Sequence, residues 1–418
     1  MTDNNTRQGS SLMQFIPVML CFFAMGFVDL VGTASNYVKQ DLGLDAGSTG
    51  FFATMVFFWF LIFSVPTGIL MNRIGRKKTV LISLVVTAFS LIIPIFGDTY
   101  VVMVISFSFL GIGNAIMQTS LNPLVSNLIA PSKLASTLTL GQFVKAIASF
   151  LAPILAAWGA ATALPTFGLG WRALFLIYAL VSILSIVLLA STPIKEERPD
   201  KVTGLKECIV LLSNPFILLC FIGIICHVGI DVGTNVMAPQ ILRAHFNDMA
   251  LDAANYSIQI YFVCRCIGCF LGAFILRFVS PKKFFALSVA LMLAAMIILG
   301  TSSSLMMLYV GVGLVGFGNS NIFSIIFAQA LNYCPNEKNE VSGLMIMGLI
   351  GGAIFPPVMG IAADAFNQAG PVVTEIVDGA TQSVQLLSPT ASVAAVAVLT
   401  VGVLYLAFYT LKIKQAGK

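Results

Sequence analysis

Twelve long apolar stretches dominate this sequence, and each is long enough to cross a lipid bilayer as a helix. A membrane-spanning helix needs about 20 mostly apolar residues. Only 9% of the residues are charged and 58% are hydrophobic, whereas a soluble domain carries about 25% charged residues. We therefore predict an all-α integral membrane protein without a sizeable soluble domain. The predicted spans cover roughly residues 12–38, 46–71, 79–97, 99–129, 135–162, 171–192, 215–242, 252–277, 283–301, 305–333, 341–366 and 388–411.

A charged, proline-bearing segment separates the first six spans from the last six. We expect an N-terminal six-helix half at residues 1–192, a cytoplasmic linker at 193–214 and a C-terminal six-helix half at 215–418. The stretch at 367–387 is polar and mildly acidic, and we expect it to form an external loop.

Lysine and arginine residues indicate which side of the membrane each loop faces. With the N-terminus inside, the tails and internal loops hold 17 of the 22 basic residues, and the external side holds only Lys39, Arg172 and Arg243. Because basic loop residues gather on the cytoplasmic side, we predict cytoplasmic termini in the cell inner membrane. The net charge of +5 comes from these loops, so it does not indicate a nucleic-acid partner.

Several short motifs recur in the two halves of the chain. Parallel repeats of six spans, related by an axis along the membrane normal, are a transporter architecture that places the solute site between the halves. The recurrences are GILMNRIGRKK (68–78) with GAFILRFVSPKK (272–283), VDLVGT (28–33) with IDVGT (230–234), and GIGN (111–114) with GFGN (316–319).

Four charged side chains lie inside the apolar spans: Asp29, Lys145, Asp231 and Arg265. A charge at membrane depth costs roughly 2.5–3.5 kcal/mol, so it needs a partner, a water-filled cavity or a function. Asp29 and Asp231 occupy matching places in the repeats, which points to a central solute pathway. Asp29 is either a substrate or coupling residue or the structural partner of Lys145, and Arg265 holds either Asp231 or an anionic substrate.

Polar, uncharged side chains also lie within the apolar spans. His227, Asp231 and Asn235 form a stripe at i, i+4 and i+8, which is either a proton or sodium site or a locally satisfied polar group. Helix–helix hydrogen bonding is the alternative for the amides of span 4. The remaining candidates for substrate binding or coupling are Gln118, Asn122, Gln142, Lys145 and Asn319.

The motif GILMNRIGRKK resembles the signature loop of the major facilitator superfamily, roughly GxLxDRxGRKx, with Asn72 in place of the usual acid. The resemblance implies twelve transmembrane helices in two pseudo-symmetric six-helix halves and a gating role for the loop. Gly351, Gly352, Pro356 and Pro357 weaken span 11. Helix breakers at membrane depth occur where the backbone lines a cavity or moves, so the two prolines join this group. The predicted gating residues are Gly68, Asn72, Arg73, Gly75, Arg76, Pro356 and Pro357.

A narrower resemblance, to the fucose–galactose–glucose:proton symporter group, covers most of the chain. It rests on FSVPTGILM (63–71), IMQTSLNP (116–123), LTLGQFVKAIASFLAP (138–153), GFGNSNIFSIIF (316–327) and SGLMIMGLIGGAIFPPVMGIAAD (342–364). The resemblance implies a sugar permease driven by a cation gradient. At three positions the charge differs from the group's pattern. Gln118 stands in place of an acid, Lys145 in place of an asparagine, and Cys269 in place of an arginine.

These observations predict a secondary transporter that imports a sugar or sugar derivative by alternating access, with the proton as the coupling ion and sodium as the alternative. The competing functions are an exporter, an exchanger of organic anions or acidic sugars, and a membrane receptor. Enzyme chemistry is not expected, because the only histidines are His227 and His245 and no HExxH, GxSxG or P-loop motif occurs. We expect no cofactor, no metal site and no nucleic-acid partner. The expected partners are a small-molecule sugar and the bilayer, with the monomer as the functional form.

Overall fold

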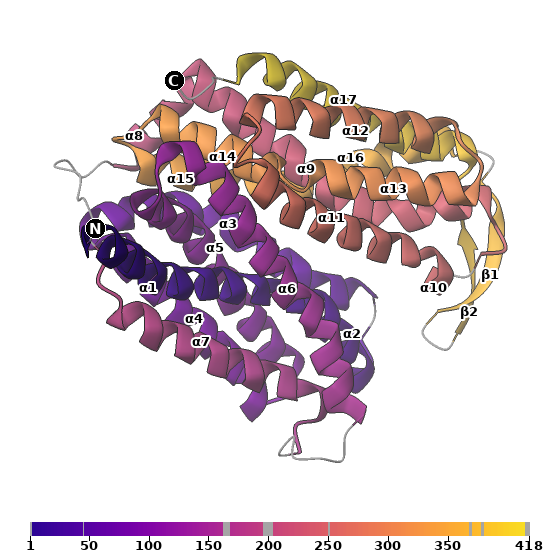
Figure 1. The fold of residues 1–418 in the computed structure, drawn as a ribbon. Helices are drawn as coiled ribbons and strands as arrows, with labels where there is room; N and C mark the ends of the chain where they lie inside the picture. Colours follow the sequence, from indigo (N-terminus) through magenta and orange to yellow (C-terminus); the bar gives the residue numbers. More distant parts are fainter. Residues whose placement is uncertain are drawn as a thin grey trace. The chain divides into compact units, whose positions relative to one another are not determined.

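The computed structural model describes residues 2–44, 46–161, 168–194, 204–249, 251–367, 370–377 and 380–413. Among them, twelve helical segments are long and apolar enough to cross a membrane, which confirms the predicted number of spans. The chain folds into two compact units, one formed by residues 1–214 and 331–347 and the other by 215–330 and 348–418 (Figure 1).

The first unit contains the first six spans. Its helices are α1 (Thr2–Met25), the 3-10 helix η1 (Gly26–Asp29), α2 (Leu30–Leu42), α3 (Ala46–Ile74), α4 (Arg76–Phe96), α5 (Tyr100–Leu128), η2 (Pro131–Lys133), α6 (Leu134–Ala161), η3 (Gly170–Arg172), α7 (Ala173–Ser191), α8 (Leu205–Val210), η4 (Leu211–Ser213) and α15 (Lys338–Met347).

The second unit contains the spans from 7 onward, apart from α15. Its elements are α9 (Pro215–His245), α10 (Leu251–Ala254), α11 (Tyr256–Ile275), α12 (Pro281–Thr301), α13 (Leu305–Asn319), α14 (Ile322–Tyr333, whose last three residues join the first unit), η5 (Gly348–Ile350), α16 (Gly351–Phe366), the strands β1 (Val372–Val377) and β2 (Ala380–Gln385), and α17 (Pro389–Lys412).

Short polar loops start several of these helices. Ser280 and Ser388 accept hydrogen bonds from the backbone N–H groups of Lys283 and Ala391, at 3.4 and 3.2 Å, in the first turns of α12 and α17. A proline follows each serine at the first helical position, where its missing N–H costs nothing. Hydroxyl caps of this kind explain where the chain turns back into the membrane.

Two spans are interrupted by a turn of 3-10 helix. Span 1 tightens at η1, just before α2, and span 11 tightens at η5, just before α16. In span 11 the helix α16 continues through Pro356 and Pro357, so the break lies one to two turns earlier than those prolines. It coincides with the glycines: a Cβ added at Gly351 would overlap the carbonyl oxygen of Ile225, so close backbone contact selects glycine there.

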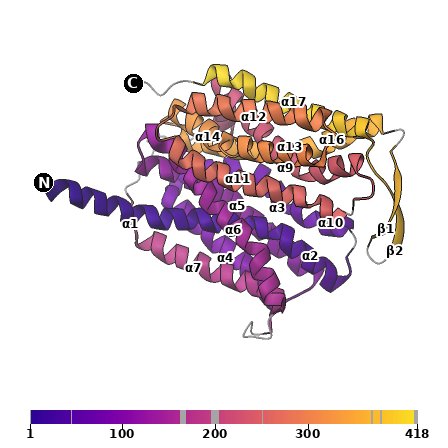
Figure 2. The same ribbon diagram turned by 45° about the vertical axis from the view of Figure 1, so that its right-hand side comes forward.

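Within the stretch that we expect to form an external loop, residues 372–377 and 380–385 form two antiparallel strands. Val372 pairs with Gln385 and Val377 with Ala380. In the sequence, Asp-Gly separates the two strands, and this dipeptide is typical of a short hairpin connection. Asn367 ties its base to the bundle, because the backbone N–H of Ser388 donates to the Asn367 side chain at 2.7 Å. Figures 1 and 2 show the hairpin beyond the ends of the helices of the second unit.

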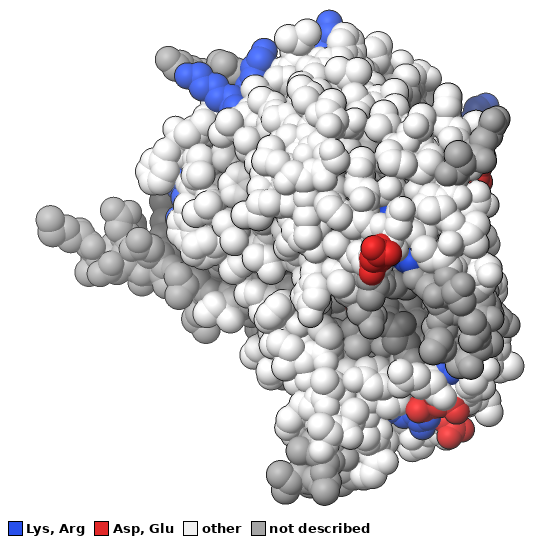
Figure 3. All heavy atoms as spheres, turned by 90° about the vertical axis from the view of Figure 1, so that its right-hand side faces the viewer, with Lys and Arg blue, Asp and Glu red and all other residues white. Residues whose placement is uncertain are grey.

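The outer surface of the helices is apolar. On the face drawn in Figure 3, described charged side chains occur at a few places and uncharged residues cover most of the rest. Large apolar side chains point outward from the spans, for example Phe89 on α4 and Val401 on α17, which are 53% and 68% exposed. Such a surface is stable against lipid tails and not against water, which fits a multi-pass membrane protein.

Candidate functional site

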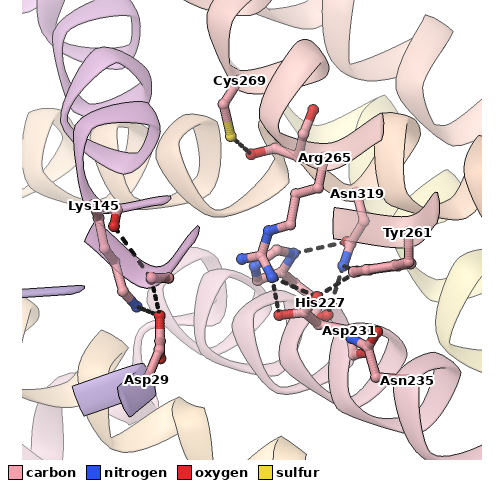
Figure 4. Close-up of polar contacts among 11 residues, drawn as sticks. Asp29, Lys145, His227, Asp231, Asn235, Tyr261, Arg265, Cys269 and Asn319 are labelled. Carbon is pink, nitrogen blue, oxygen red and sulfur yellow. Dashed lines mark hydrogen bonds and ion pairs between the residues drawn. The ribbon is translucent and has the colours of Figure 1, made fainter. Parts of the chain in front are cut away.

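In the first unit, two of the charged side chains predicted from the sequence lie together (Figure 4). Lys145 on α6 places its Nζ 3.9 Å from Oδ2 of Asp29, which ends the 3-10 helix η1. The hydroxyl of Ser149, one turn beyond Lys145, donates to the same carboxylate oxygen at 2.5 Å. The Asp29 side chain remains 44% exposed, so this carboxylate is accessible and only loosely paired.

The turn that carries Asp29 is fitted tightly between its neighbours. A Cβ added at Gly26 would overlap the carbonyl oxygen of Lys145, so glycine lets η1 approach the backbone of α6. Phe27 stacks on Tyr178 with ring centroids 4.0 Å apart. Close packing of this kind fixes where the turn lies and which way its last side chain points.

In the second unit, an aspartate and an arginine form a close ion pair (Figure 4). Nη1 of Arg265 on α11 donates to Oδ1 and Oδ2 of Asp231 on α9, at 2.6 and 2.5 Å. The hydroxyl of Tyr261, one turn before Arg265, also donates to Asp231. The side chain of Asp231 is only 14% exposed. Asp231 is therefore a held carboxylate, in contrast to Asp29.

A histidine and an asparagine extend this second cluster. Nδ1 of His227 lies 2.7 Å from Oδ1 of Asn319, at the end of α13. The Asn319 amide donates to the His227 carbonyl oxygen at 3.1 Å and to the Tyr261 hydroxyl at 3.5 Å. His227 and Asn319 are both buried. The stripe at i, i+4 and i+8 thus splits, because Asn235 turns its amide back to the Asp231 carbonyl of its own helix at 2.8 Å.

The other predicted amides have local partners or none. Gln118 donates to Oδ1 of Asn114 at 2.7 Å, and Asn122 donates to the Gln118 carbonyl oxygen at 2.8 Å. Among the described residues, Oδ1 of Asn122, Nε2 of Gln142 and Oδ1 of Asn235 are buried without a hydrogen-bond partner. Because an unpaired buried polar atom is costly, these atoms are candidate contacts for a solute or water. In the same part of the chain, no group of three His, Cys, Asp or Glu side chains could hold a metal ion.

The predicted gating loop is tied to α15 within the first unit. Asn72 donates to Oε1 of Glu340 and accepts from the Asn339 amide, each at 2.5 Å. Nε of Arg76 donates to the Asn339 side-chain oxygen at 2.6 Å. A Cβ at Gly68 would lie 2.7 Å from the Asn339 carbonyl oxygen, so the repeated glycine permits this close approach.

The remaining predicted gating residues differ in their surroundings. Gly75 has φ +92° and ψ 159°, a backbone conformation nearly restricted to glycine. Arg73 is exposed, and Pro356 and Pro357 lie on the partly exposed face of α16.

Five residues of these clusters are absent from the sequence prediction: Ser149, Tyr261, Asn114, Asn339 and Glu340. Ser149 follows Lys145 by four residues and Tyr261 precedes Arg265 by four, so helical spacing alone could have suggested both. Asn114 closes the repeated GxGN motif. Glu340 has no local signal, because it reaches the loop from 268 residues away.

Comparison with known proteins places these clusters in a family context. A model of the Major Facilitator Superfamily matches residues 18–356. A glucose/galactose transporter of Brucella abortus is 27% identical over 369 residues, which are 83% of this chain and 87% of that protein. A putative glucose/galactose transporter of Helicobacter pylori is 26% identical over 375 residues, 82% of this chain and 87% of that protein. Among solved structures, the E. coli fucose:proton symporter superimposes with a TM-score of 0.76 at 17% identity, covering 96% of this chain and 99% of that one.

Proposed function

This chain belongs to the Major Facilitator Superfamily, and we propose that it imports a sugar or sugar derivative across the cell inner membrane by cation symport. Because this is a family of transporters, we propose no enzymatic activity for the chain. The two relatives named as glucose/galactose transporters support a sugar as the solute. The proposed mechanism is alternating access by a monomer with cytoplasmic termini, in which the coupling ion is the proton and sodium is the alternative.

One observation carries the coupling proposal: the two repeat-related aspartates have opposite surroundings. A coupling carboxylate has to gain and lose a proton in each transport cycle. Asp29 is exposed, and its nearest cation is 3.9 Å away. Asp231 accepts two hydrogen bonds from Arg265 and one from Tyr261, so both of its oxygens are engaged. We therefore assign proton exchange to Asp29 and a fixed hydrogen-bonding role to Asp231.

The charges also bear on which solute is transported. Each cluster pairs one carboxylate with one cation, Asp29 with Lys145 and Asp231 with Arg265. Because each pair is electrically balanced, an uncharged sugar fits better than a sugar acid, and hydroxyl groups can bond to both charged and amide partners. An exchanger of organic anions remains the second candidate, since Lys145 and Arg265 are cations within the spans.

Transport by purified protein in liposomes tests this function. Uptake of radiolabelled D-glucose and D-galactose is measured with an inward proton gradient, an inward sodium gradient, and no gradient. We expect accumulation under the proton gradient and its loss in Asp29→Asn. The matched control is Asp98→Asn, an exposed carboxylate that pairs with Arg172 at 3.8 Å outside the spans.

Two results would contradict the proposal. Accumulation at the wild-type level in Asp29→Asn would remove the coupling role of that carboxylate. Exchange of internal for external D-galacturonate, without accumulation of either neutral sugar, would favour the anion exchanger.

We further propose that the network joining the loop at residues 68–78 to α15 opens and closes during transport. Its contacts are polar and reversible: Asn72 bonds Glu340 and Asn339, and Arg76 bonds Asn339. The break η5 follows directly after α15 and gives span 11 a point at which to bend. The gating roles of Arg73, Pro356 and Pro357 stay predictions.

A further inference from the structure

The turn that presents Asp29 has a polar contact with span 4. Nδ2 of Asn114 donates to the carbonyl oxygen of Met25 at 2.7 Å, the residue directly before η1. Gln118 donates to the other end of the same amide at 2.7 Å. Because the amide oxygen is occupied by Gln118, the amide nitrogen of Asn114 faces Met25. Both side chains are buried, at 2% and 5% exposure.

The second unit contains the repeat counterpart of this contact. Asn319, which closes the second GxGN motif, donates to the carbonyl oxygen of His227 at 3.1 Å. His227 lies four residues before Asp231, just as Met25 lies four residues before Asp29. The two asparagines thus contact equivalent backbone positions in the two repeats.

The backbone conformation next to the aspartate differs between the repeats. Span 1 has Gly26 three residues before its aspartate, where span 7 has Val228. Span 7 remains regular α-helix through this region, whereas span 1 forms a 3-10 turn.

We propose that Asn114, oriented by Gln118, is a positioning residue that keeps η1 in its tight turn and thereby holds Asp29 toward Lys145 and Ser149. The inference rests on the proposed coupling role of Asp29. It also gives Gln118 a role in orienting Asn114, in place of the predicted contact with the solute.

The geometry of the two helix types gives the size of the effect. A 3-10 helix turns 120° and rises 2.0 Å per residue, against 100° and 1.5 Å for an α-helix. Relaxation of the four residues of η1 to α-helix would therefore rotate Asp29 by about 80° and shift it by about 2 Å along the axis. Rotation on that scale would remove the carboxylate from Lys145 and Ser149.

Labelling of a thiol at position 29 tests the positioning directly and needs no solute. Asp29→Cys is introduced alone and together with Asn114→Leu, Gln118→Leu or Ser120→Ala. Reaction with a small methanethiosulfonate reagent is followed by mass spectrometry of the peptide that contains position 29, which separates it from the eight native cysteines. Ser120→Ala is the matched control, because Ser120 is buried on the same helix and its hydroxyl donates to the Ile116 and Met117 carbonyls of that helix.

We expect Asn114→Leu to change the labelling rate about fivefold or more, since thiol reactivity follows accessibility, and Gln118→Leu to change it in the same direction by less. Ser120→Ala should leave the rate unchanged. An unchanged rate in Asn114→Leu overturns the inference. If that variant does not fold, an unchanged rate in Gln118→Leu overturns it instead.

A transport measurement separates positioning from a merely structural role. With Asp29 present, Asn114→Leu should lower proton-driven accumulation of D-galactose by roughly tenfold or more, because misplacement of a functional group by about 1 Å can cost up to 100-fold. Exchange of D-galactose at equal concentrations on both sides should persist. Parallel loss of accumulation and exchange would mean a structural role and would overturn the inference. Full accumulation in Asp29→Asn would instead refute the coupling proposal, and the labelling result would still stand by itself.

Discussion

Removal of the arginine of the second cluster should destabilise the protein far more than removal of the lysine of the first. In Arg265→Met, the carboxylate of Asp231 loses both hydrogen bonds from the guanidinium. Loss of one partner of a buried ion pair costs about 3–5 kcal/mol. The two side chains are 25% and 14% exposed, so we take the lower end, about 3 kcal/mol. For a folding unit of 150–250 residues, that lowers the Tm by about 6–12 °C.

The Asp29–Lys145 pair supplies a control within the same protein. Its atoms are 3.9 Å apart and the carboxylate is 44% exposed. Pairs that are exposed and long contribute about 0–1 kcal/mol, so Lys145→Met should lower the Tm by no more than about 4 °C. Thermal unfolding of the detergent-purified variants, followed by tryptophan fluorescence or circular dichroism, measures both shifts under one set of conditions.

The double variant Asp231→Asn/Arg265→Met completes the test. Asparagine removes the stranded charge and can still accept a hydrogen bond from Tyr261. The double variant should therefore recover at least half of the Tm lost in Arg265→Met, since removal of both charges of a buried pair is often close to neutral. Equal Tm losses in Arg265→Met and Lys145→Met, or no recovery in the double variant, would refute the assignment of one tight and one loose pair.

Three further changes test the packing around the loop and the turn. Gly75→Ala should cost about 1–3 kcal/mol, because φ of +92° is strained for any residue with a Cβ, and a lower Tm measures it. Asn72→Leu takes one hydrogen bond from Glu340, so we expect a loss of about 1.5–3 kcal/mol, and a Tm equal to wild type would contradict that contact. Gly26→Val should abolish proton-driven accumulation in liposomes, since its side chain would overlap the Lys145 carbonyl; normal accumulation would show that η1 is free to move.

The amino-acid sequence predicts the spans well because lipid imposes one dominant requirement on them. Every backbone group at membrane depth needs a partner in its own segment, so long apolar runs become helices. Charges within those runs stand out for the same reason. The pairing of Arg265 with Asp231 follows from the cost of leaving either charge alone, and it was one of the two predicted roles for that arginine.

The finer geometry depends on contacts between segments that are distant in the chain. Asn114 contacts Met25, which lies 89 residues away in the sequence. The sequence of neither span alone predicts the relative position of spans 1 and 4 that permits this contact. From the sequence, Gly26 cannot be distinguished from any other small residue of a packed helix. Its close contact with the Lys145 carbonyl is visible only in the structure. In span 11, the sequence names Gly351, Gly352, Pro356 and Pro357 as helix breakers, but only the structure shows that the 3-10 turn lies next to Gly351, where the backbone approaches Ile225.

The hydrogen-bond roles of the amides were the least predictable part of the candidate site. An amide on a helix face can donate to its own helix, to a neighbouring helix or to a solute, and spacing does not choose among these. Gln118 and Asn235 both turned to protein partners, one on each unit. Among the predicted amides, Gln142 presents a buried donor with no hydrogen-bond partner in the part of the chain that the structure describes.

The membership of α15 in the first unit sets an order for biosynthesis. The side chains and backbone of α3 that receive α15, including Ser64 and Gly68, are made early, whereas residues 338–347 are made after ten spans have been synthesised. At 5–20 residues per second, translation from the end of α7 to the end of α15 takes about 8–30 s. During that interval the first six helices lie in the membrane without α15. We therefore expect an N-terminal fragment cut between the two sequence halves to lack the contacts of Ser64 and Gly68 with α15 until the C-terminal fragment is supplied in the same cell.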